Sequence, residues 1–226
     1  MSNEEGKRRA AAAAVEMVEP GMVVGLGSGS TAEIFVELLA GRVKGGLRFT
    51  GVATSVGTAE AARRLGIGII DPNSHVSIDL AVDGADEVDG DLNLVKGLGG
   101  ALVREKIVGS AAKRVVIIVD ESKMVERLGA KTPIPVEVVQ FGWSLTAERL
   151  KGLGCVPTLR RQGAAPVISD NGNYILNCDF GPISEPARVE RELNCIPGVV
   201  EAGLFCGMAD FVLAGSETGV RSLERG

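Results

Sequence analysis

The sequence predicts an α/β fold with two domains: a Rossmann-like, doubly wound sheet and a smaller α+β domain of ferredoxin-like type. Up to about residue 120, short apolar stretches of strand length alternate with stretches of helix length. This alternation is typical of a parallel sheet with helical crossovers. Near residue 133 the pattern changes, and the extended and helical stretches then follow the order β-α-β-β-α-β.

In the first domain, a helix over 4–18 is expected to stop at Pro20-Gly21. The strand 22–26 then leads through a glycine loop into a helix that ends by Gly41. The other elements expected here are strands at 47–54, 67–70, 78–82 and 114–120, and helices at 58–66 and 100–112.

In the second domain, an Asn-Gly pair at 171–172 between two apolar runs indicates a hairpin. The expected strands are 133–141, 155–161, 165–169, 173–180 and 198–205, with helices at 144–154 and 184–194. A strand at 209–215 is expected to return to the first sheet. The predicted domains are therefore 1–130 plus 205–226, and 131–204.

Composition excludes several classes of protein. The 24 basic residues are scattered among 29 acidic ones, so we expect no nucleic-acid partner. No apolar run reaches the roughly 18 residues needed to span a membrane, and no signal-peptide pattern is seen, so we expect a cytoplasmic protein without a membrane partner. The four cysteines form no CxxC pair and His75 is the single histidine, so a zinc site is not expected.

A glycine loop, Gly25 to Thr31, joins the first strand to the next helix. Glycines allow the backbone to approach an anion, and the N–H groups of a helix N-terminus attract one, so the loop fits a phosphate site. A tight strand-to-helix turn capped by Ser30 or Thr31 explains the same residues. The loop lacks both the GxGxxG spacing of a dinucleotide site and the Gly-Lys-Ser/Thr of a Walker loop.

An acidic stretch follows the strand at 78–82, at the edge of the sheet where open α/β folds bind ligands. Asp83 and Asp86 in this stretch would ligate Mg²⁺, bind hydroxyls or transfer protons, or they would only cap a turn. Glu87 and Asp89 come next, and four carboxylates so close together repel one another unless a cation is near. The candidate cations are Lys96 and Lys123.

Glu105 is placed near the start of a helix, after the glycine-rich turn that carries Lys96. A carboxylate on one face of a substrate can remove a proton next to a carbonyl, and an ammonium group can stabilise the resulting enediolate. The alternative for Glu105 is a surface residue paired with a nearby Lys or Arg, and for Lys123 a solvated loop lysine. His75 has no recognisable partner.

Four segments together resemble ribose-5-phosphate isomerase, type A: 25–32, 83–89, 96–107 and 120–123. The resemblance implies an aldose–ketose isomerase that interconverts D-ribose 5-phosphate and D-ribulose 5-phosphate in the non-oxidative pentose phosphate pathway. It further implies a homodimer or homotetramer that uses no metal and no cofactor.

The same resemblance implies roles for individual residues. Glu105 would move the proton between C1 and C2, while Asp83 and Lys96 would assist ring opening and stabilise the enediolate. Asp86 would hold sugar hydroxyls and Lys7 would help to neutralise the phosphate. The remaining residues expected at the substrate are Ser28, Gly29, Ser30, Thr31, Gly84, Ala85, Gly97, Leu98, Gly99 and Lys123.

The sequence departs from the family pattern at two places. Ser28 stands where threonine is common, and it keeps a hydroxyl. Leu98 interrupts a run of glycines, which is expected to reshape the pocket slightly. Three other functions fit the same residues: a sugar-phosphate deaminase, an acyl-CoA transferase with a glutamate nucleophile, and a non-catalytic sugar-phosphate sensor.

Overall fold

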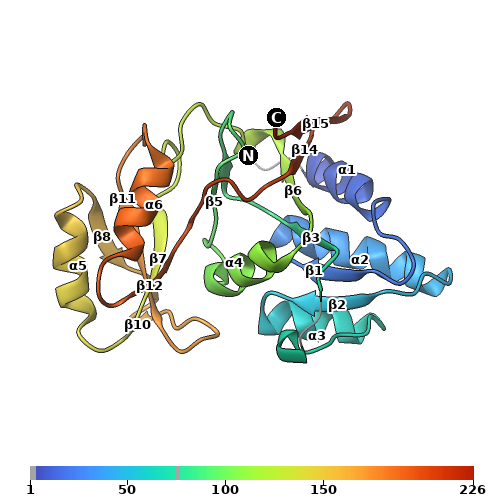
Figure 1. Cartoon of the computed structure of the whole chain (residues 1–226), viewed down its shortest axis with the longest axis horizontal. Helices are drawn as coiled ribbons and strands as arrows, with labels where there is room; N and C mark the ends of the chain where they lie inside the picture. The colour runs from blue at the N-terminus through green and yellow to red at the C-terminus, as the bar shows by residue number, and fades with distance from the viewer. Residues whose placement is uncertain (1–3, 75–76) are drawn as a thin grey trace. The chain divides into compact units, whose positions relative to one another are not determined.

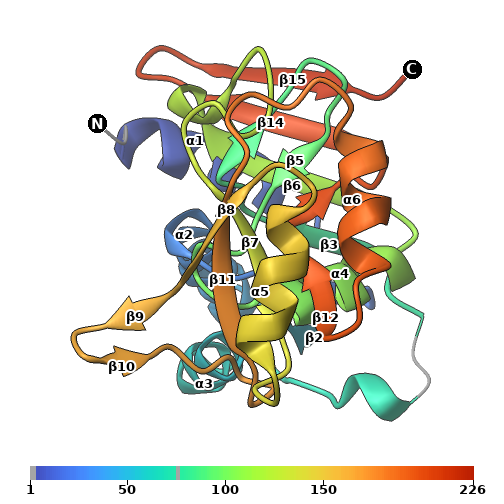
Figure 2. The same cartoon turned by 90° about the vertical axis from the view of Figure 1, so that its left-hand side faces the viewer.

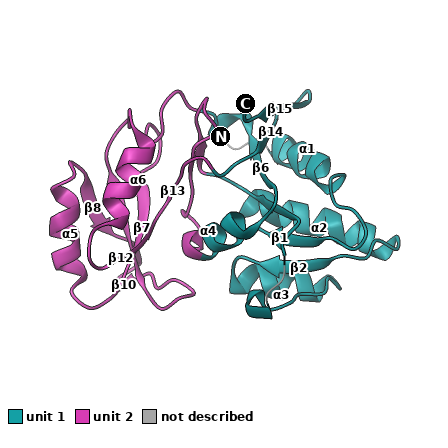
Figure 3. Cartoon of the chain, in the orientation of Figure 1, with its two compact units in different colours: residues 1–85, 104–124, 208–226 teal, residues 86–103, 125–207 magenta. Residues whose placement is uncertain are grey.

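A computed structural model describes residues 4–74 and 77–226 of the chain (Figure 1). His75 lies outside the described residues. The chain forms two compact units, drawn in different colours in Figure 3. Unit 1 comprises Met1–Ala85, Arg104–Met124 and Met208–Gly226, and unit 2 comprises Asp86–Val103 and Val125–Gly207. None of the described helices is long and apolar enough to cross a membrane.

Unit 1 is built on a six-stranded sheet in the order β15-β14-β6-β3-β1-β2. All neighbours are parallel except β14 and β15. The order places β2 and β3 on opposite sides of β1, which is the switch point where doubly wound sheets bind ligands. The strands are β1 (Val23–Leu26), β2 (Thr50–Ala53), β3 (Leu80–Asp83), β6 (Val115–Asp120), β14 (Phe211–Gly215) and β15 (Val220–Glu224).

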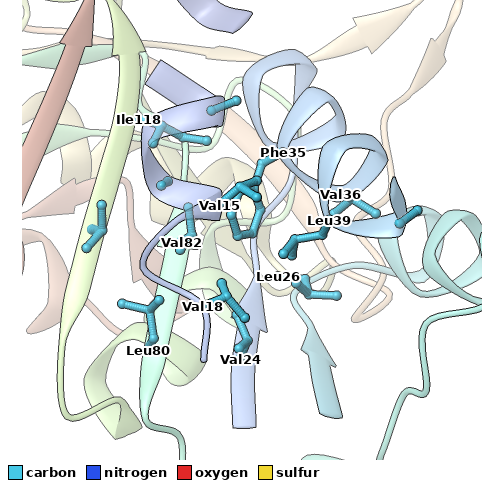
Figure 4. Close-up of a cluster of buried hydrophobic side chains, with 14 of the residues drawn as sticks. Val15, Val18, Val24, Leu26, Phe35, Val36, Leu39, Leu80, Val82 and Ile118 are labelled. Atoms are coloured by element: carbon cyan, nitrogen blue, oxygen red, sulfur yellow. The ribbon is translucent and has the colours of Figure 1, made fainter. Parts of the chain in front are cut away.

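Strand alternation assigns the helices of unit 1 to the two faces of its sheet. Val24, Leu26 and Val82 point into a core shared with α1 and α2, as Figure 4 shows. Gly25, between two of these residues, faces the other side, where a Cβ would meet Val108 of α4. The helices are α1 (Glu4–Val15), α2 (Ser30–Lys44), α3 (Val56–Arg64) and α4 (Leu102–Ala111), with 3₁₀ turns η1 (Pro72–Ser74) and η2 (Glu121–Lys123).

Unit 2 contains an antiparallel sheet in the order β12-β7-β11-β8, which is the ferredoxin-like arrangement. Figure 2 shows α5 and α6 on one face of this sheet, and both helices contribute to its core. Its elements are β7 (Ile134–Val138), α5 (Trp143–Lys151), β8 (Val156–Leu159), β11 (Tyr174–Asp179), α6 (Pro186–Asn194) and β12 (Val199–Ala202). A hairpin of β9 (Arg161–Gln162) and β10 (Ala165–Pro166) follows β8, and a small sheet joins β4 (Glu87–Val88), β5 (Leu94–Val95) and β13 (Leu204–Phe205).

The predicted fold class is confirmed, but several predicted details differ. The strand expected at 67–70 is reduced to a single bridge between Gly51 and Ile69. Residues 86–103 and 125–130, predicted in the first domain, group with unit 2 because β4 and β5 pair with β13. The division of the chain into functional domains stays a prediction.

Candidate active site

The glycine loop of unit 1 is shaped by two glycines, one required by space and one favoured by backbone conformation. A Cβ at Gly27 would overlap the carboxylate of Asp83. Gly29, the N-cap of α2, has a φ of 91°, which strongly favours glycine. Since a glycine has no side chain to cap the helix, the first N–H groups of α2 receive no side-chain acceptor from the N-cap position.

The Ser28 hydroxyl is engaged with two buried threonines. Its Oγ lies 2.8 Å from Thr54 Oγ1 and 3.2 Å from Thr58 Oγ1. Thr58 also donates to Gly27 O at 3.0 Å. The hydroxyl that Ser28 keeps in place of the family's threonine therefore ties the loop to the end of β2 and the start of α3.

Lys7 brings a positive charge to the N-terminus of α2. The lysine is only 6% exposed, and its Nζ donates to Ser30 Oγ at 2.9 Å and to Glu4 at 3.1 Å. Thr31 follows in the first turn and is buried. Lys7, Ser30 and the helix N-terminus thus form a cationic, donor-rich corner at the carboxyl end of β1.

Asp83 closes β3 beside the glycine loop and is 6% exposed. Its Oδ1 accepts hydrogen bonds from Ser28 N at 3.1 Å and Gly84 N at 2.7 Å. These donors stabilise the charged carboxylate where it is largely removed from water. The chain then continues through Gly84 and the half-buried Ala85.

Glu105 lies on the same face of the sheet as Asp83. It precedes Val108 of α4 by three residues, so both point toward the sheet, and Val108 packs over Gly25 of β1. Because Val82 faces the opposite core, its neighbour Asp83 faces the α4 side. Glu105 is 7% exposed, so it is a buried residue rather than a surface one.

The direction of α4 places Glu105 at the same edge as Asp83. Ala112, just after the helix, forms a bridge with Ile78, which precedes β3. The C-terminus of α4 therefore lies at the amino end of β3, and its N-terminus lies toward the carboxyl end. Two buried carboxyl groups thus share one face and one edge of the sheet, next to the glycine loop.

Lys123 lies in η2, directly after β6, at the carboxyl end of the same sheet. Asp120 precedes this turn, and its carboxylate accepts a hydrogen bond from Ser122 N at 3.0 Å. The side chain of Lys123 is partly buried. Lys123 therefore lies at the same edge of the unit 1 sheet as the glycine loop and Asp83.

In unit 2, the acidic residues after Asp83 accept hydrogen bonds from N–H groups, and the charge of Asp86 also acts on the guanidinium of Arg160. Asp86 Oδ2 accepts Leu98 N at 3.0 Å. The fully buried Glu87 accepts the backbone N–H groups of Gly129, Lys131 and Thr132 at 2.6–2.7 Å. Asp89 accepts Asp91 N, Asn93 N and Asn93 Nδ2 at 2.8–3.0 Å.

Lys96 is 4% exposed and lies in unit 2. Its N–H donates to Gly203 O at 2.9 Å, and its Nζ lies 5.6 Å from the centroid of the Phe205 ring. The aromatic face attracts the ammonium group electrostatically. Phe205 therefore orients a lysine whose charge is kept out of bulk water.

The turn after Lys96 requires glycine at two positions, Gly97 (φ 101°) and Gly100 (φ 86°). Leu98 has no positive φ, and its side chain is 42% exposed. The leucine in place of a family glycine is therefore accommodated without backbone strain. Leu98 and Gly99 present their backbone at an exposed surface.

Comparison with known proteins identifies the family. The family model for ribose 5-phosphate isomerase A (phosphoriboisomerase A) matches residues 50–219. The chain belongs to the ribose 5-phosphate isomerase A family. The resemblance inferred from the four motifs, and the isomerase activity that it implied, are thereby confirmed.

Relatives and solved structures cover the whole chain. Ribose-5-phosphate isomerase A of Thermomicrobium roseum is 56% identical over all of this chain and 96% of its own length, and that of Gloeobacter violaceus is 52% identical over 96% and 95%. A D-ribose-5-phosphate isomerase solved in complex with phospho-erythronic acid superposes with a TM-score of 0.96 at 43% identity, covering 100% of both chains. The ribose 5-phosphate isomerase A of Methanocaldococcus jannaschii gives 0.94 at 40% identity, covering 99% of this chain and all of its own.

The predicted site residues fall into two groups, one in each unit. Asp83 and Glu105 gather with the glycine loop in unit 1, and Asp86 and Lys96 lie with the glycine turn in unit 2. Sequence reasoning missed Thr54, Thr58 and Phe205. The two threonines follow β2, at the same carboxyl edge as the loop, and this position was the signal that could have revealed them.

Proposed function

We propose that this protein interconverts D-ribose 5-phosphate and D-ribulose 5-phosphate through an enediolate. The observation that carries the proposal is the placement of Glu105 and Asp83 on one face and one edge of the sheet, beside an anion-binding loop. The isomerase family of the chain supports the same substrate pair.

Glu105 is proposed as the base that takes a proton from one carbon and returns it to the next. Moving a proton between C1 and C2 of an open-chain sugar needs one carboxylate that reaches both carbons on the same side. Burial protects the enediolate from water. Asp83, with its carboxylate fixed by two N–H donors, is proposed to assist ring opening.

The phosphate is proposed to bind at the N-terminus of α2. Gly29 and Ser30 would contribute backbone donors, Ser30 and Thr31 hydroxyls, and Lys7 the charge. Ser28 would act by fixing the loop, and Lys123 would contribute a second cation from the end of β6.

In unit 2, Lys96 is proposed to stabilise the negative charge on the enediolate oxygen. Asp86 is proposed to bind sugar hydroxyls, together with the backbone of Gly97, Leu98 and Gly99. Gly84 and Ala85 connect these groups to Asp83 along the chain. The burial of Lys96 supports this role, because an ammonium group stabilises a negative charge more strongly away from water.

The protein is further proposed to act in the cytoplasm as a homodimer or homotetramer, without nucleic-acid or membrane partners. None of the four cysteines, all in the described part of the chain, forms a disulfide, which supports a reducing compartment. Light scattering coupled to size-exclusion chromatography tests the assembly. A monomer at micromolar concentration would contradict that part of the proposal.

The activity is tested by incubating the purified protein with ribose 5-phosphate and following ketose formation. Ribulose 5-phosphate is expected as the product, and unphosphorylated ribose is expected to react far more slowly because the loop would have no anion to bind. Equal rates with both sugars would contradict the phosphate site. No ketose from either sugar would contradict the isomerase.

A further inference from the structure

The turn after Lys96 is held on both sides of its peptide groups by residues of unit 2. The carbonyls of Gly97 and Leu98 each accept a hydrogen bond from Arg160 Nη1 at 2.9 Å. On the other side, Leu98 N–H donates to Asp86 Oδ2 at 3.0 Å. The planes of two successive peptides are therefore fixed.

Arg160 is itself fixed by the sheet of unit 2. Its Nε and Nη2 both donate to Asn177 Oδ1, at 3.1 and 2.6 Å, and Asn177 lies in the middle of β11. Burial lowers the pKa of the Arg160 guanidinium, while the negative charge of Asp86 acts in the opposite direction. A guanidinium stays charged under such a balance, so its donors are always available.

The geometry of the trans peptide determines where the next donor points. In a trans peptide the C=O and N–H point in opposite directions, and none of the described residues has a cis peptide bond. With Leu98 O bound to Arg160, the N–H of Gly99 points away from Arg160. Gly99 is exposed, and a Cβ there would meet nothing within 4 Å, so this side has room for a ligand atom.

We propose that Arg160 is a positioning residue, which sets the glycine turn so that Gly99 N–H and the Asp86 carboxylate bind the oxygens of the open-chain sugar. The inference deepens the proposed isomerase function and rests on it. Arg160 does not touch the substrate. It acts through two carbonyls that a lysine, with a single ammonium and no rigid fork, would hold less well.

The test compares Arg160→Met and Arg160→Lys with Arg161→Met. Arg161 is the next residue along the chain, is exposed, and donates to Ala164 O at 2.7 Å, so it is a matched control. Arg160→Met is expected to lower kcat/KM for ribose 5-phosphate by roughly 10- to 100-fold, the effect of a misplaced binding group. The kcat/KM of Arg160→Lys should lie between the values of wild type and Arg160→Met, and the kcat/KM of Arg161→Met should equal that of wild type.

Two inhibitors separate positioning from a general loss of structure. Phospho-erythronate carries oxygens in the place of the sugar's, so its affinity should fall with kcat/KM in Arg160→Met. Inorganic phosphate engages only the loop of unit 1, so its affinity should not change. Asn177→Leu should reproduce part of the loss and add little in the Arg160→Met background, because both act through one contact.

The outcomes distinguish this inference from the proposed function. An inactive wild-type protein would overturn the isomerase proposal itself. An active wild type with unchanged kcat/KM in Arg160→Met would overturn only the positioning role, as would an equal loss of affinity for both inhibitors. If Arg160→Met does not fold, hydrogen exchange of Arg160→Lys decides: faster exchange confined to residues 97–100 supports the inference, and exchange unchanged there contradicts it.

Discussion

At residue 27, the absence of a side chain lets the glycine loop approach Asp83 closely enough for the N–H of Ser28 to donate to the carboxylate. A single methyl group would fill this space. The carboxylate would then have to leave its two donors, Ser28 N and Gly84 N. Specificity for glycine at this position therefore comes from the site rather than from backbone conformation, since Gly27 has no positive φ.

Gly27→Ala is expected to lower kcat for ribose 5-phosphate by about 100-fold, because a displacement of roughly 1 Å in a catalytic group has this effect. Steady-state kinetics measures it. Gly41→Ala in α2 is the control, since a Cβ there meets nothing within 4 Å, and it should raise the free energy of unfolding by up to about 1 kcal/mol. A wild-type value of kcat in Gly27→Ala would show that catalysis does not depend on the position of the Asp83 carboxylate.

Glu105→Gln is expected to reduce kcat by about 10²–10⁴-fold, the usual contribution of a general base, while sugar-phosphate binding is largely kept. The amide has nearly the same shape but cannot accept the proton. Glu121→Gln, on the exposed surface of η2, is the control and should be fully active. Isothermal titration with ribose 5-phosphate gives the affinity, and lost binding with normal residual turnover would contradict the assignment.

The motifs predicted which residue types gather near the site, but not how each is held. Asp83 could be selected because it directly follows a predicted strand, and Glu105 because it lies near the start of a predicted helix. Glu87 and Asp89 accept hydrogen bonds mainly from backbone N–H groups, and such partners leave no mark in a sequence. Arg160 was missed for a similar reason: the carbonyls it binds lie some 60 residues away along the chain.

At the scale of elements, a buried carboxylate connects β4 to the segment that precedes β7. Glu87 Oε1 accepts the N–H groups of Lys131 and Thr132, and Oε2 accepts that of Gly129. Three donors on one carboxylate satisfy backbone groups that would otherwise lack partners in this segment. This contact fixes the segment just before the unit 2 sheet begins.

Glu87→Gln is expected to lower the free energy of unfolding by about 1–3 kcal/mol, because an amide NH₂ would face the N–H of Gly129 and leave it unsatisfied. Glu126→Gln, the same change on an exposed residue, should have no measurable effect. Urea unfolding followed by circular dichroism measures both. Equal stability of Glu87→Gln and wild type would mean that water replaces the lost acceptor.

Asp79, just before β3, should make stability depend on pH in acid. A hydrogen bond from Lys113 and another from Val23 N lower the pKa of this carboxyl group below its ordinary value. A lowered pKa in the folded state gives stability that is present above the unfolded pKa, near 4, and is lost as pH falls through the folded pKa. Since the side chain is partly exposed, the effect should be small.

The expected result is that wild type loses more stability than Asp79→Asn as pH falls below about 4, while the difference between them is constant from pH 5 to 7. Urea unfolding at each pH provides the comparison. Parallel stability curves over the acid range would contradict a role for Asp79. Asp71→Asn, on an exposed turn, is the control.

Most elements of the fold could be predicted from periodicity, and the exceptions have physical reasons. The strand β15 was missed because its residues are mostly polar and exposed, as expected for an edge strand. The apolar run 67–70 was taken for a strand, yet it pairs through one bridge only. The strands β4 and β5 contain two residues each, too few to show any alternation, and the single strand predicted at 198–205 is divided into β12 and β13.

For the whole molecule, the proposed chemistry needs only side chains of the protein. A carboxylate moves the proton and an ammonium group stabilises the charge, so activity after exhaustive EDTA treatment is expected to equal that of untreated protein. Ketose formation from ribose 5-phosphate in metal-depleted buffer measures this. Inactivation that Mg²⁺ restores would contradict the proposal that no metal takes part.

The boundaries of the two compact units differ from those of the two predicted domains. Sequence patterns locate elements well but do not say which strands pair, and here β5 pairs with β13, more than 100 residues further on. The ferredoxin-like order of unit 2 was predictable because its six main elements are consecutive. The grouping of residues 86–103 with that unit could not be predicted from the sequence pattern.

The position of β14 in the sheet of unit 1 has a consequence for biosynthesis. This strand lies between β6 and β15, and Gly215 at its end touches Gly6 of α1, so a helix made early by the ribosome packs against a strand made long afterwards. Until β14 has been translated, α1 can pack only on earlier elements such as α2 and β6 and lacks that support. The nascent protein therefore completes the packing behind its anion-binding corner only after the elements of unit 2 have emerged.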